Sequence, residues 1–144
     1  MLNGVPLKKR ILVTGSRNWT DRTRLFLALS VQTALCDEIV IVHGDASGAD
    51  ALADSFAVNH PRTRAERHPA DWGRPCDERC YHKSRYRADG TEYCPMAGHY
   101  RNQEMVDLGA DICLAFPLGK SNGTRDCMRR AAKAGIPVSN FGDR

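Results

Sequence analysis

Four potential metal ligands lie close together near the middle of the chain. They are Cys76, Cys80, His82 and Cys94. Their spacing, C-x3-C-x-H-x11-C, falls in a polar segment with too few apolar residues to build a core of its own. Zinc takes thiolate and imidazole ligands in tetrahedral geometry, and a closed set of four leaves no position for a substrate. The pattern therefore predicts a structural zinc knuckle.

Two alternatives to this zinc site stay open on the sequence. His68 or His99 could replace His82 as the fourth ligand. The segment could also be a reduced loop with free thiols, although exposed cysteines are chemically reactive. The other three cysteines, Cys36, Cys113 and Cys127, lie in apolar stretches and are expected in the core.

Three glycine-rich segments follow apolar runs and could bind an anion. They are GSRNWTD at 15–21, GDASGAD at 44–50 and PLGKSNGT at 117–124. Glycine lets the backbone approach a phosphate, and the N–H groups of a following helix carry partial positive charge. The candidate ligand-binding residues there are Gly15, Ser16, Arg17, Gly44, Asp45, Ser47, Gly48, Asp50, Gly119, Ser121, Gly123 and Thr124.

Each of these segments alone is weak evidence, because a glycine after a strand is usually a turn. Neither the dinucleotide fingerprint G-x-G-x-x-G nor the Walker pattern G-x-x-x-x-G-K-[ST] occurs in the sequence. In an open parallel sheet, however, the loops after the strands meet at one edge, where ligands bind. Three such loops together favour a ligand site over turns alone.

The elements that would position these loops alternate along the chain. Short apolar runs at 10–14, 38–43, 63–68, 111–116 and 136–138 predict strands, and helices are expected at 20–35, from Ala49, at 99–108 and at 124–134. Alternation of this kind is typical of an α/β fold with a parallel sheet covered on both faces. We therefore expect a Rossmann-like three-layer sandwich with about five strands.

Length and composition indicate a single domain. The chain has 144 residues, of which 42% are hydrophobic, and this suits one compact core over 1–144 with a Cys/His-rich insertion at about 69–98. No apolar run approaches the roughly 18 to 20 residues of a membrane helix, and no signal-peptide core follows the N-terminal MLNGVPLKKR. A soluble, cytoplasmic protein without a membrane partner is expected.

The net charge of +4 is mild, but basic residues gather between Arg62 and Arg87. This suits an anionic partner or a solvated loop, and the stretch lacks the regularly interleaved aromatic residues of a platform for stacking bases. Trp19 and Trp72 each follow an expected strand, and each could stack on a base or lie buried in the wall of a site.

The order of several segments resembles a known family. VTGSRNWTD, VHGDASGADALA, HPADW, AGHYRNQEMVDLGAD and LAFPLGKSNGTRD are similar to the YspA-type branch of the SLOG superfamily, which is related to the Lonely Guy and DprA Rossmann-like proteins. The resemblance covers nearly the whole chain outside the insertion. It implies a nucleotide-related ligand, a homodimer and, in some members, cleavage of the N-glycosidic bond of nucleoside monophosphates.

The resemblance also suggests particular residues. The Lonely Guy pattern R-K-x-x-M is similar to the segment 101–105, which makes Arg101 and Asn102 candidate ligand-binding residues and Arg101 a candidate catalytic residue. In the second Lonely Guy pattern, P-G-G-x-G-T-x-x-E, the last glycine and the threonine match Gly123 and Thr124, but Cys127 stands at the glutamate position. Asp126, one residue earlier, is then the candidate catalytic carboxylate, with Asp50 or Glu104 as alternatives.

Three functional hypotheses follow. The first is a module that binds or senses a nucleotide-derived small molecule, which the missing glutamate favours. The second is an N-glycosidic phosphoribohydrolase acting on nucleotides. The third is a nucleic-acid-binding protein whose basic insertion contacts phosphates, and the modest net charge argues against it.

Overall fold

The computed structural model describes residues 4, 6–74, 76, 80 and 85–142, and it confirms an α/β fold with a parallel sheet of five strands. The strands are β1 (Lys8–Gly15), β2 (Glu38–His43), β3 (Thr63–Arg67), β6 (Ile112–Phe116) and β7 (Val138–Asn140), in the order β3-β2-β1-β6-β7. The helices are α1 (Arg22–Thr33), α2 (Ala49–Asn59), α3 (Ala97–Leu108) and α4 (Asn122–Lys133).

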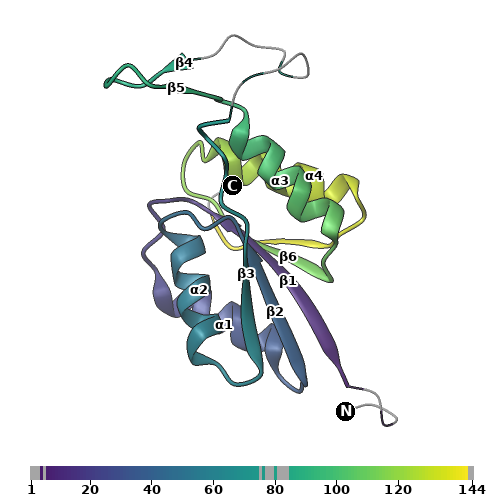
Figure 1. The fold of residues 1–144 in the computed structure, drawn as a ribbon. Coiled ribbons are helices and arrows are strands. Elements are labelled where there is room, and N and C mark those ends of the chain that lie inside the picture. The colour runs from purple at the N-terminus through teal and green to yellow at the C-terminus, as the bar shows by residue number, and fades with distance from the viewer. Residues whose placement is uncertain (1–3, 5, 75, 77–79, 81–84, 143–144) are drawn as a thin grey trace.

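The sheet separates two apolar cores, because successive side chains of a strand point to opposite faces. Ile11 and Val13 of β1 pack with α1 and α2, whereas Leu12 packs with α3 and α4. Figure 1 shows one helix pair on each side of the sheet. The predicted core cysteines are confirmed as buried: Cys36 lies in the first core, and Cys113 and Cys127 lie in the second.

The element boundaries differ from the expected ones by a few residues. Asp21 accepts a hydrogen bond from the Arg24 amide and is the N-cap of α1. The insertion carries a short antiparallel hairpin that its sequence did not indicate, formed by β4 (Arg85–Tyr86) and β5 (Glu92–Tyr93). The hairpin projects beyond the carboxyl ends of the parallel strands (Figure 1). No helix in the described ranges is long and apolar enough to cross a membrane.

An ion pair across the sheet gives a prediction on stability. Arg10 of β1 donates two hydrogen bonds, of 3.1 and 2.9 Å, to the Glu66 carboxylate of β3. Together with a hydrogen bond from His68, this lowers the pKa of Glu66 from 4.5 to about 2. The ionised Glu66 therefore stabilises the folded chain fully at a pH above 4.5, its pKa in the unfolded chain, and this contribution is lost as the pH falls toward 2.

Glu66→Gln is expected to lower the free energy of unfolding by about 1–2 kcal/mol at pH 7, since water partly screens the pair. The deficit should shrink as the pH falls from 5 toward 3, as measured by urea denaturation. Glu38→Gln is the matched control, because Glu38 forms a 3.4 Å ion pair with Lys8 that is well exposed. A pH-independent deficit for Glu66→Gln would contradict this account.

Candidate functional site

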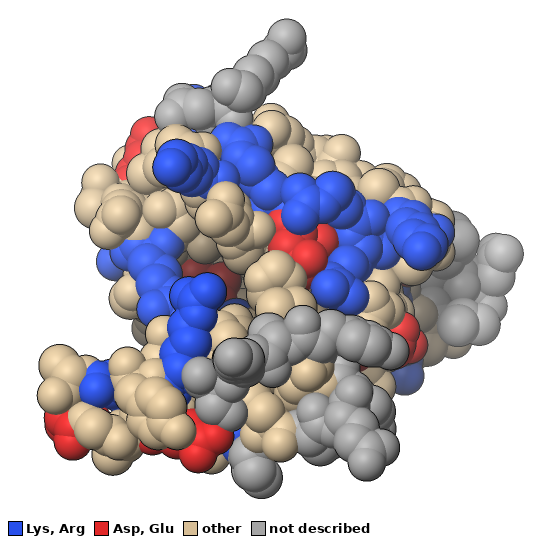
Figure 2. All heavy atoms as spheres, turned by 90° about the horizontal axis from the view of Figure 1, so that it is seen from above, with Lys and Arg blue, Asp and Glu red and all other residues tan. Residues whose placement is uncertain are grey.

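A pocket of about 630 Å³ lies where the loops after β1, β2 and β6 meet the start of α3. Its volume is within the range of about 300–1,000 Å³ that is common for small-molecule sites. Seen from above, Lys and Arg side chains gather around a hollow on this face (Figure 2). The topology explains this meeting of loops, because the carboxyl ends of parallel strands share one edge of the sheet.

Most of the candidate ligand-binding residues line this pocket. Those in the lining are Gly15, Ser16, Arg17, Gly44, Asp50, Arg101, Asn102, Ser121, Gly123 and Thr124. Asp45, Ser47, Gly48 and Gly119 lie outside it.

The residues outside the lining help to shape the loops. Gly48 has a φ of 71°, and a Cβ there would overlap the backbone of Ser16 and Arg17, so glycine lets the β1 and β2 loops touch. Asp45 is exposed, with a φ of 55°, and its amide donates a 2.9 Å hydrogen bond to Nδ1 of His43. That bond fixes the turn that carries the Asp45 side chain outward.

Asp50, in the first turn of α2, lies at the bottom of the pocket and is 6% exposed. Its Oδ2 accepts hydrogen bonds from the amides of Gly44 and Ala46, at 3.1 and 3.3 Å. Its Oδ1 is buried and has no hydrogen-bond partner among the described residues. Burial raises the pKa of Asp50, whereas the electrostatic effect of His43 and the hydrogen bonds from the two amides lower it by a smaller amount. An unpaired buried acceptor is costly, so a ligand hydroxyl that donates to Oδ1 would be favoured.

Arg101, on α3, also lines the pocket, and its guanidinium contacts the same Gly44 backbone as Asp50. It donates to the carbonyl oxygens of Gly44 and His68 and to the side-chain oxygen of Asn102. Burial lowers the pKa of Arg101, and the charge of Asp50 opposes this most. A Cβ at Gly44 would overlap the guanidinium, so glycine is required for Arg101 to lie here.

The start of α4 contributes a polar part of the pocket wall. Lys120, Ser121, Asn122, Gly123 and Thr124 line it together with Ser16 and Arg17 of the β1 loop. The first N–H groups of a helix have no partner within the helix, and they carry partial positive charge. Hydroxyls, helix amides and two cations at one end of a cavity can bind a phosphate group.

Asp126, the candidate catalytic carboxylate, lies behind the lining. It accepts hydrogen bonds from Asn102 at 3.1 Å and Arg130 at 2.8 Å, and its Oδ1 lies 3.0 Å from Nδ1 of His99. Arg130, Asn102 and His99 together lower the pKa of Asp126 against the opposing effect of its burial, which is the largest single influence. Asn102 and His99 do line the pocket, so Asp126 positions two side chains that can contact a ligand.

The other candidate carboxylates also differ in position. Glu104 is exposed on α3, 3.9 Å from His68, and lies outside the lining. Cys127, at the glutamate position of the Lonely Guy pattern, is buried in the core. A hydrogen bond with Cys113 lowers the pKa of Cys127. Among the described residues, Asp50 is thus the one acidic side chain in the pocket wall.

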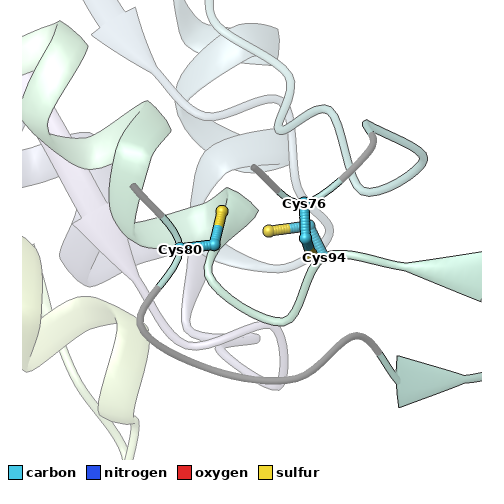
Figure 3. Close-up of side chains that lie close together, drawn as sticks. All are labelled: Cys76, Cys80 and Cys94. Atoms are coloured by element: carbon cyan, nitrogen blue, oxygen red, sulfur yellow. The ribbon is translucent and has the colours of Figure 1, made fainter. Parts of the chain in front are cut away.

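Three of the four candidate metal ligands come together in the insertion. The sulfur atoms of Cys76, Cys80 and Cys94 lie within 4.8 Å of one another (Figure 3). Thiolates on a tetrahedral zinc, each with a bond of about 2.3 Å, are about 3.8 Å apart. These three cysteines could therefore hold a metal ion. The fourth candidate, His82, lies outside the described residues.

The proposed substitutes for His82 have other partners, and the cluster has one further neighbour. His68 lies 2.9 Å from Glu66, and His99 lies beside Asp126. Tyr100 of α3 donates a 3.2 Å hydrogen bond to the sulfur of Cys80, which raises the pKa of Tyr100 to about 12. This bond ties the cysteine cluster to the helix that carries Arg101.

Several residues in the lining were not predicted. Asn18, Lys120, Asn122 and Pro95 all face the pocket, and His99 does so although it was considered only as a metal ligand. Lys120 and Asn122 lie inside a glycine-rich segment, so their polarity and place in the loop could have identified them. For Pro95 the sequence carries no comparable signal, because it reaches the pocket through the path of the insertion.

Comparison with known proteins supports the resemblance seen in the sequence. The chain is 46% identical over 143 residues to the gene 61 protein of Mycobacterium phage D29, which covers 94% of this chain and 98% of that protein. The fold of the present chain is similar to a structure of DNA processing protein A from Helicobacter pylori, which was reported for its single-stranded DNA binding mode. The TM-score is 0.57 and the sequence identity is 18%. That match covers 96% of this chain and 66% of the Helicobacter chain.

The sequence model of the YspA, cpYpsA-related SLOG family matches residues 9–74. These residues include β2, β3, all of β1 except Lys8, and two of the three glycine-rich loops that line the pocket. The chain therefore belongs to the YspA, cpYpsA-related SLOG family, and it is a relative of the phage D29 gene 61 protein.

Proposed function

We propose that the pocket binds a phosphorylated, nucleotide-like small molecule. The observation that carries this proposal is that one cavity contains both groups that can bind an anion and an unpaired carboxylate oxygen that can accept a hydrogen bond. Ser16, Arg17 and the start of α4 form an end suited to a phosphate, and the unpaired Oδ1 of Asp50 forms a point suited to a sugar hydroxyl. A ribose phosphate offers both groups within one molecule.

The test is to incubate the purified protein with nucleoside phosphates, ADP-ribose derivatives and cyclic nucleotides, remove unbound compounds by filtration, and identify what is retained by chromatography with mass detection. Retention of an intact nucleotide is expected. Asp50→Asn should reduce retention about tenfold or more. The Gly44 and Ala46 amides hold the one oxygen that remains, so the NH2 group replaces Oδ1, and this group cannot accept a hydrogen bond from a ligand hydroxyl.

Asp45→Asn is the matched control for this experiment. It makes the same chemical change on the same loop, but Asp45 is exposed and outside the lining, and asparagine tolerates its left-handed conformation. Equal retention by both variants would argue against Asp50 as a ligand contact. Absence of retention for every compound in the panel would overturn the proposed function.

A second candidate function is N-glycosidic hydrolysis, with Arg101 and a carboxylate as the catalytic pair. The observation in its favour is Asp50, because a buried carboxyl with a raised pKa can donate a proton to a leaving base. Asp126, predicted for this role, would act through Asn102 and His99. Release of a free base in the same incubation would make the protein a hydrolase, and persistence of the intact nucleotide would argue against it.

We propose that the metal of the cysteine cluster is zinc and that it is structural. Thiolate ligands favour zinc, and a closed set with His82 would leave no open position for a substrate. The three cysteines belong to a small apolar cluster that includes Trp72, Tyr100 and Ala97. Zinc would hold the insertion against the start of α3.

Two further proposals concern partners. A homodimer is expected from the family resemblance, and the mass in solution by light scattering would test it. Nucleic-acid binding is the third functional hypothesis, supported by the basic side chains around the hollow (Figure 2) and by the fold shared with DNA processing protein A. A steep fall of oligonucleotide affinity with salt would be its sign.

A further inference from the structure

A second hollow adjoins the main pocket, at the base of the β4–β5 hairpin. It has a volume of about 300 Å³ and is lined by Arg17, Trp72, Arg87 and Tyr93. Arg17 and Trp72 also line the main pocket, so the two cavities share a wall. The smaller one reaches the lower limit of about 300 Å³ for small-molecule sites and can receive one flat ring next to a ligand in the larger one.

The lining of this second hollow combines aromatic rings with cations. The guanidinium carbon of Arg17 lies 5.8 Å from the centre of the Trp72 ring, and that of Arg87 lies 5.4 Å from the centre of the Tyr93 ring. Aromatic side chains stack on nucleobases, and arginine adds attraction to rings and phosphates. Four aliphatic residues would make a hollow of the same size, but they would not offer this chemistry.

The two aromatic residues are held in place from different parts of the insertion. Tyr93 directly precedes Cys94 of the thiol cluster, and the Cys94 amide donates a 2.8 Å hydrogen bond to the Trp72 carbonyl oxygen. Trp72 packs on the thiol cluster itself, and a Cβ at Gly98 would lie 3.2 Å from its ring. The arrangement therefore exists before any ligand binds, which lowers the entropy cost of binding.

We propose that this hollow, which we name the aromatic subsite (Arg17, Trp72, Arg87 and Tyr93), binds a nucleobase whose sugar and phosphate lie in the main pocket. The inference rests on the proposed function and adds base recognition to it. The base can belong to a free nucleotide or to a single-stranded oligonucleotide, since both present the same flat ring and phosphate. The cysteine-rich insertion is thereby the element that recognises the base.

Tryptophan fluorescence can report stacking directly. The chain has two tryptophans, and Trp19 is 5% exposed in the core, so Trp19→Phe leaves Trp72 as the one reporter. Titration of this variant with the four nucleoside monophosphates and with ribose 5-phosphate separates the base from the sugar phosphate. We expect ribose 5-phosphate to bind without quenching Trp72, and at least one nucleotide to bind more tightly and to quench it.

Tyr93→Ala in the same background tests the second ring. It should weaken nucleotide binding about tenfold or more and leave the affinity for ribose 5-phosphate unchanged, because loss of one stacking residue costs about 1–3 kcal/mol per base. Tyr86→Ala is the matched control. Tyr86 lies on the same hairpin, is 68% exposed, and pairs with Glu92 rather than facing the subsite.

The outcomes separate this inference from the proposed function. If ribose 5-phosphate and the nucleotides bind equally and Trp72 is not quenched, the aromatic subsite is wrong and the phosphate site stands. If none of them binds by isothermal titration, the proposed function fails and the subsite with it. If a pentanucleotide binds more tightly than every mononucleotide, the base in the subsite belongs to a single-stranded oligonucleotide. If a mononucleotide binds more tightly than the pentanucleotide, the base belongs to a free nucleotide.

Discussion

Arg101→Gln is expected to lower the free energy of unfolding by about 1.5–3 kcal/mol at pH 7, the usual contribution of hydrogen bonds made by a charged group. The guanidinium lies between the Gly44 and His68 carbonyl oxygens, and its charge helps to offset that of buried Asp50. Without it, the ionised form of Asp50 has less compensation. Chemical denaturation monitored by circular dichroism would measure the difference.

The pH dependence of this loss follows from Asp50. Burial raises the pKa of Asp50 above its ordinary value of 3.8, so the carboxylate is ionised above that raised pKa and neutral below it. A neutral Asp50 needs no compensating cation. The cost of Arg101→Gln should therefore be largest above the raised pKa of Asp50 and should shrink as the pH falls through it.

A double-mutant cycle isolates the interaction between these two residues. Asp50→Asn removes the charge and keeps an oxygen that can accept from the Gly44 and Ala46 amides. Arg101→Gln should then cost about 1–2 kcal/mol less in the Asp50→Asn background than alone. Arg129→Gln is the control for loss of an arginine, because Arg129 is exposed on α4. Strict additivity of the two changes would contradict an electrostatic interaction between Arg101 and Asp50.

The sheet and the position of its loops could be predicted from the sequence for a simple physical reason. Buried parallel strands are short apolar runs, and the segment after each run must lie at the same edge of the sheet. Gly15 and Gly44 mark such ends, and both line the pocket. Their role goes beyond turn formation, since a Cβ at Gly44 would overlap Arg101 and a Cβ at Gly15 would overlap Ala49.

Which carboxylate faces the cavity could not be predicted from the sequence. Asp50 lies in the first turn of α2 and Asp126 directly after the first turn of α4, and both helices follow a glycine-rich loop, so their local patterns are similar. The difference comes from the neighbours. Asn102, His99 and Arg130 surround Asp126, whereas one oxygen of Asp50 is left without a partner in the described chain.

The aromatic subsite also could not be predicted from the sequence. Basic and aromatic residues do not alternate regularly between Arg62 and Arg87, and this argued against a stacking platform. In the structure the rings come from positions 21 residues apart, Trp72 and Tyr93, and the cations from Arg17 and Arg87. The path of the insertion brings these distant residues together, and the pattern of neighbouring residues in the sequence does not indicate such a contact.

Loss of the metal is expected to unfold the insertion and leave the sheet intact. The cysteine cluster forms an apolar group of its own, separate from the two cores that cover the sheet. Cys94 is fully buried in it, and burial, with Cys76 and Cys80 nearby, raises the pKa of the Cys94 thiol. Three thiols packed together without a metal gain little, whereas structural zinc in small domains contributes about 10 kcal/mol or more.

Cys94→Ser should therefore abolish bound zinc, measured by plasma mass spectrometry at about one ion per chain in the parent protein. In the Trp19→Phe background it should also shift the emission of Trp72 to longer wavelength, as water reaches that ring. The helical circular dichroism signal should stay nearly constant, because α1, α2 and α4 pack on the sheet cores. Chelation of the parent protein should reproduce both changes.

Cys36→Ser is the control for the loss of a buried thiol, since Cys36 lies in the core beneath α1, away from the cluster. It should keep the zinc and the Trp72 emission while lowering overall stability. Full zinc content in Cys94→Ser would exclude the cysteine cluster as the metal site. Cooperative unfolding of the whole chain on chelation would instead mean that the insertion and the sheet are one folding unit, because the helix α3 that joins them could not stay folded without the metal.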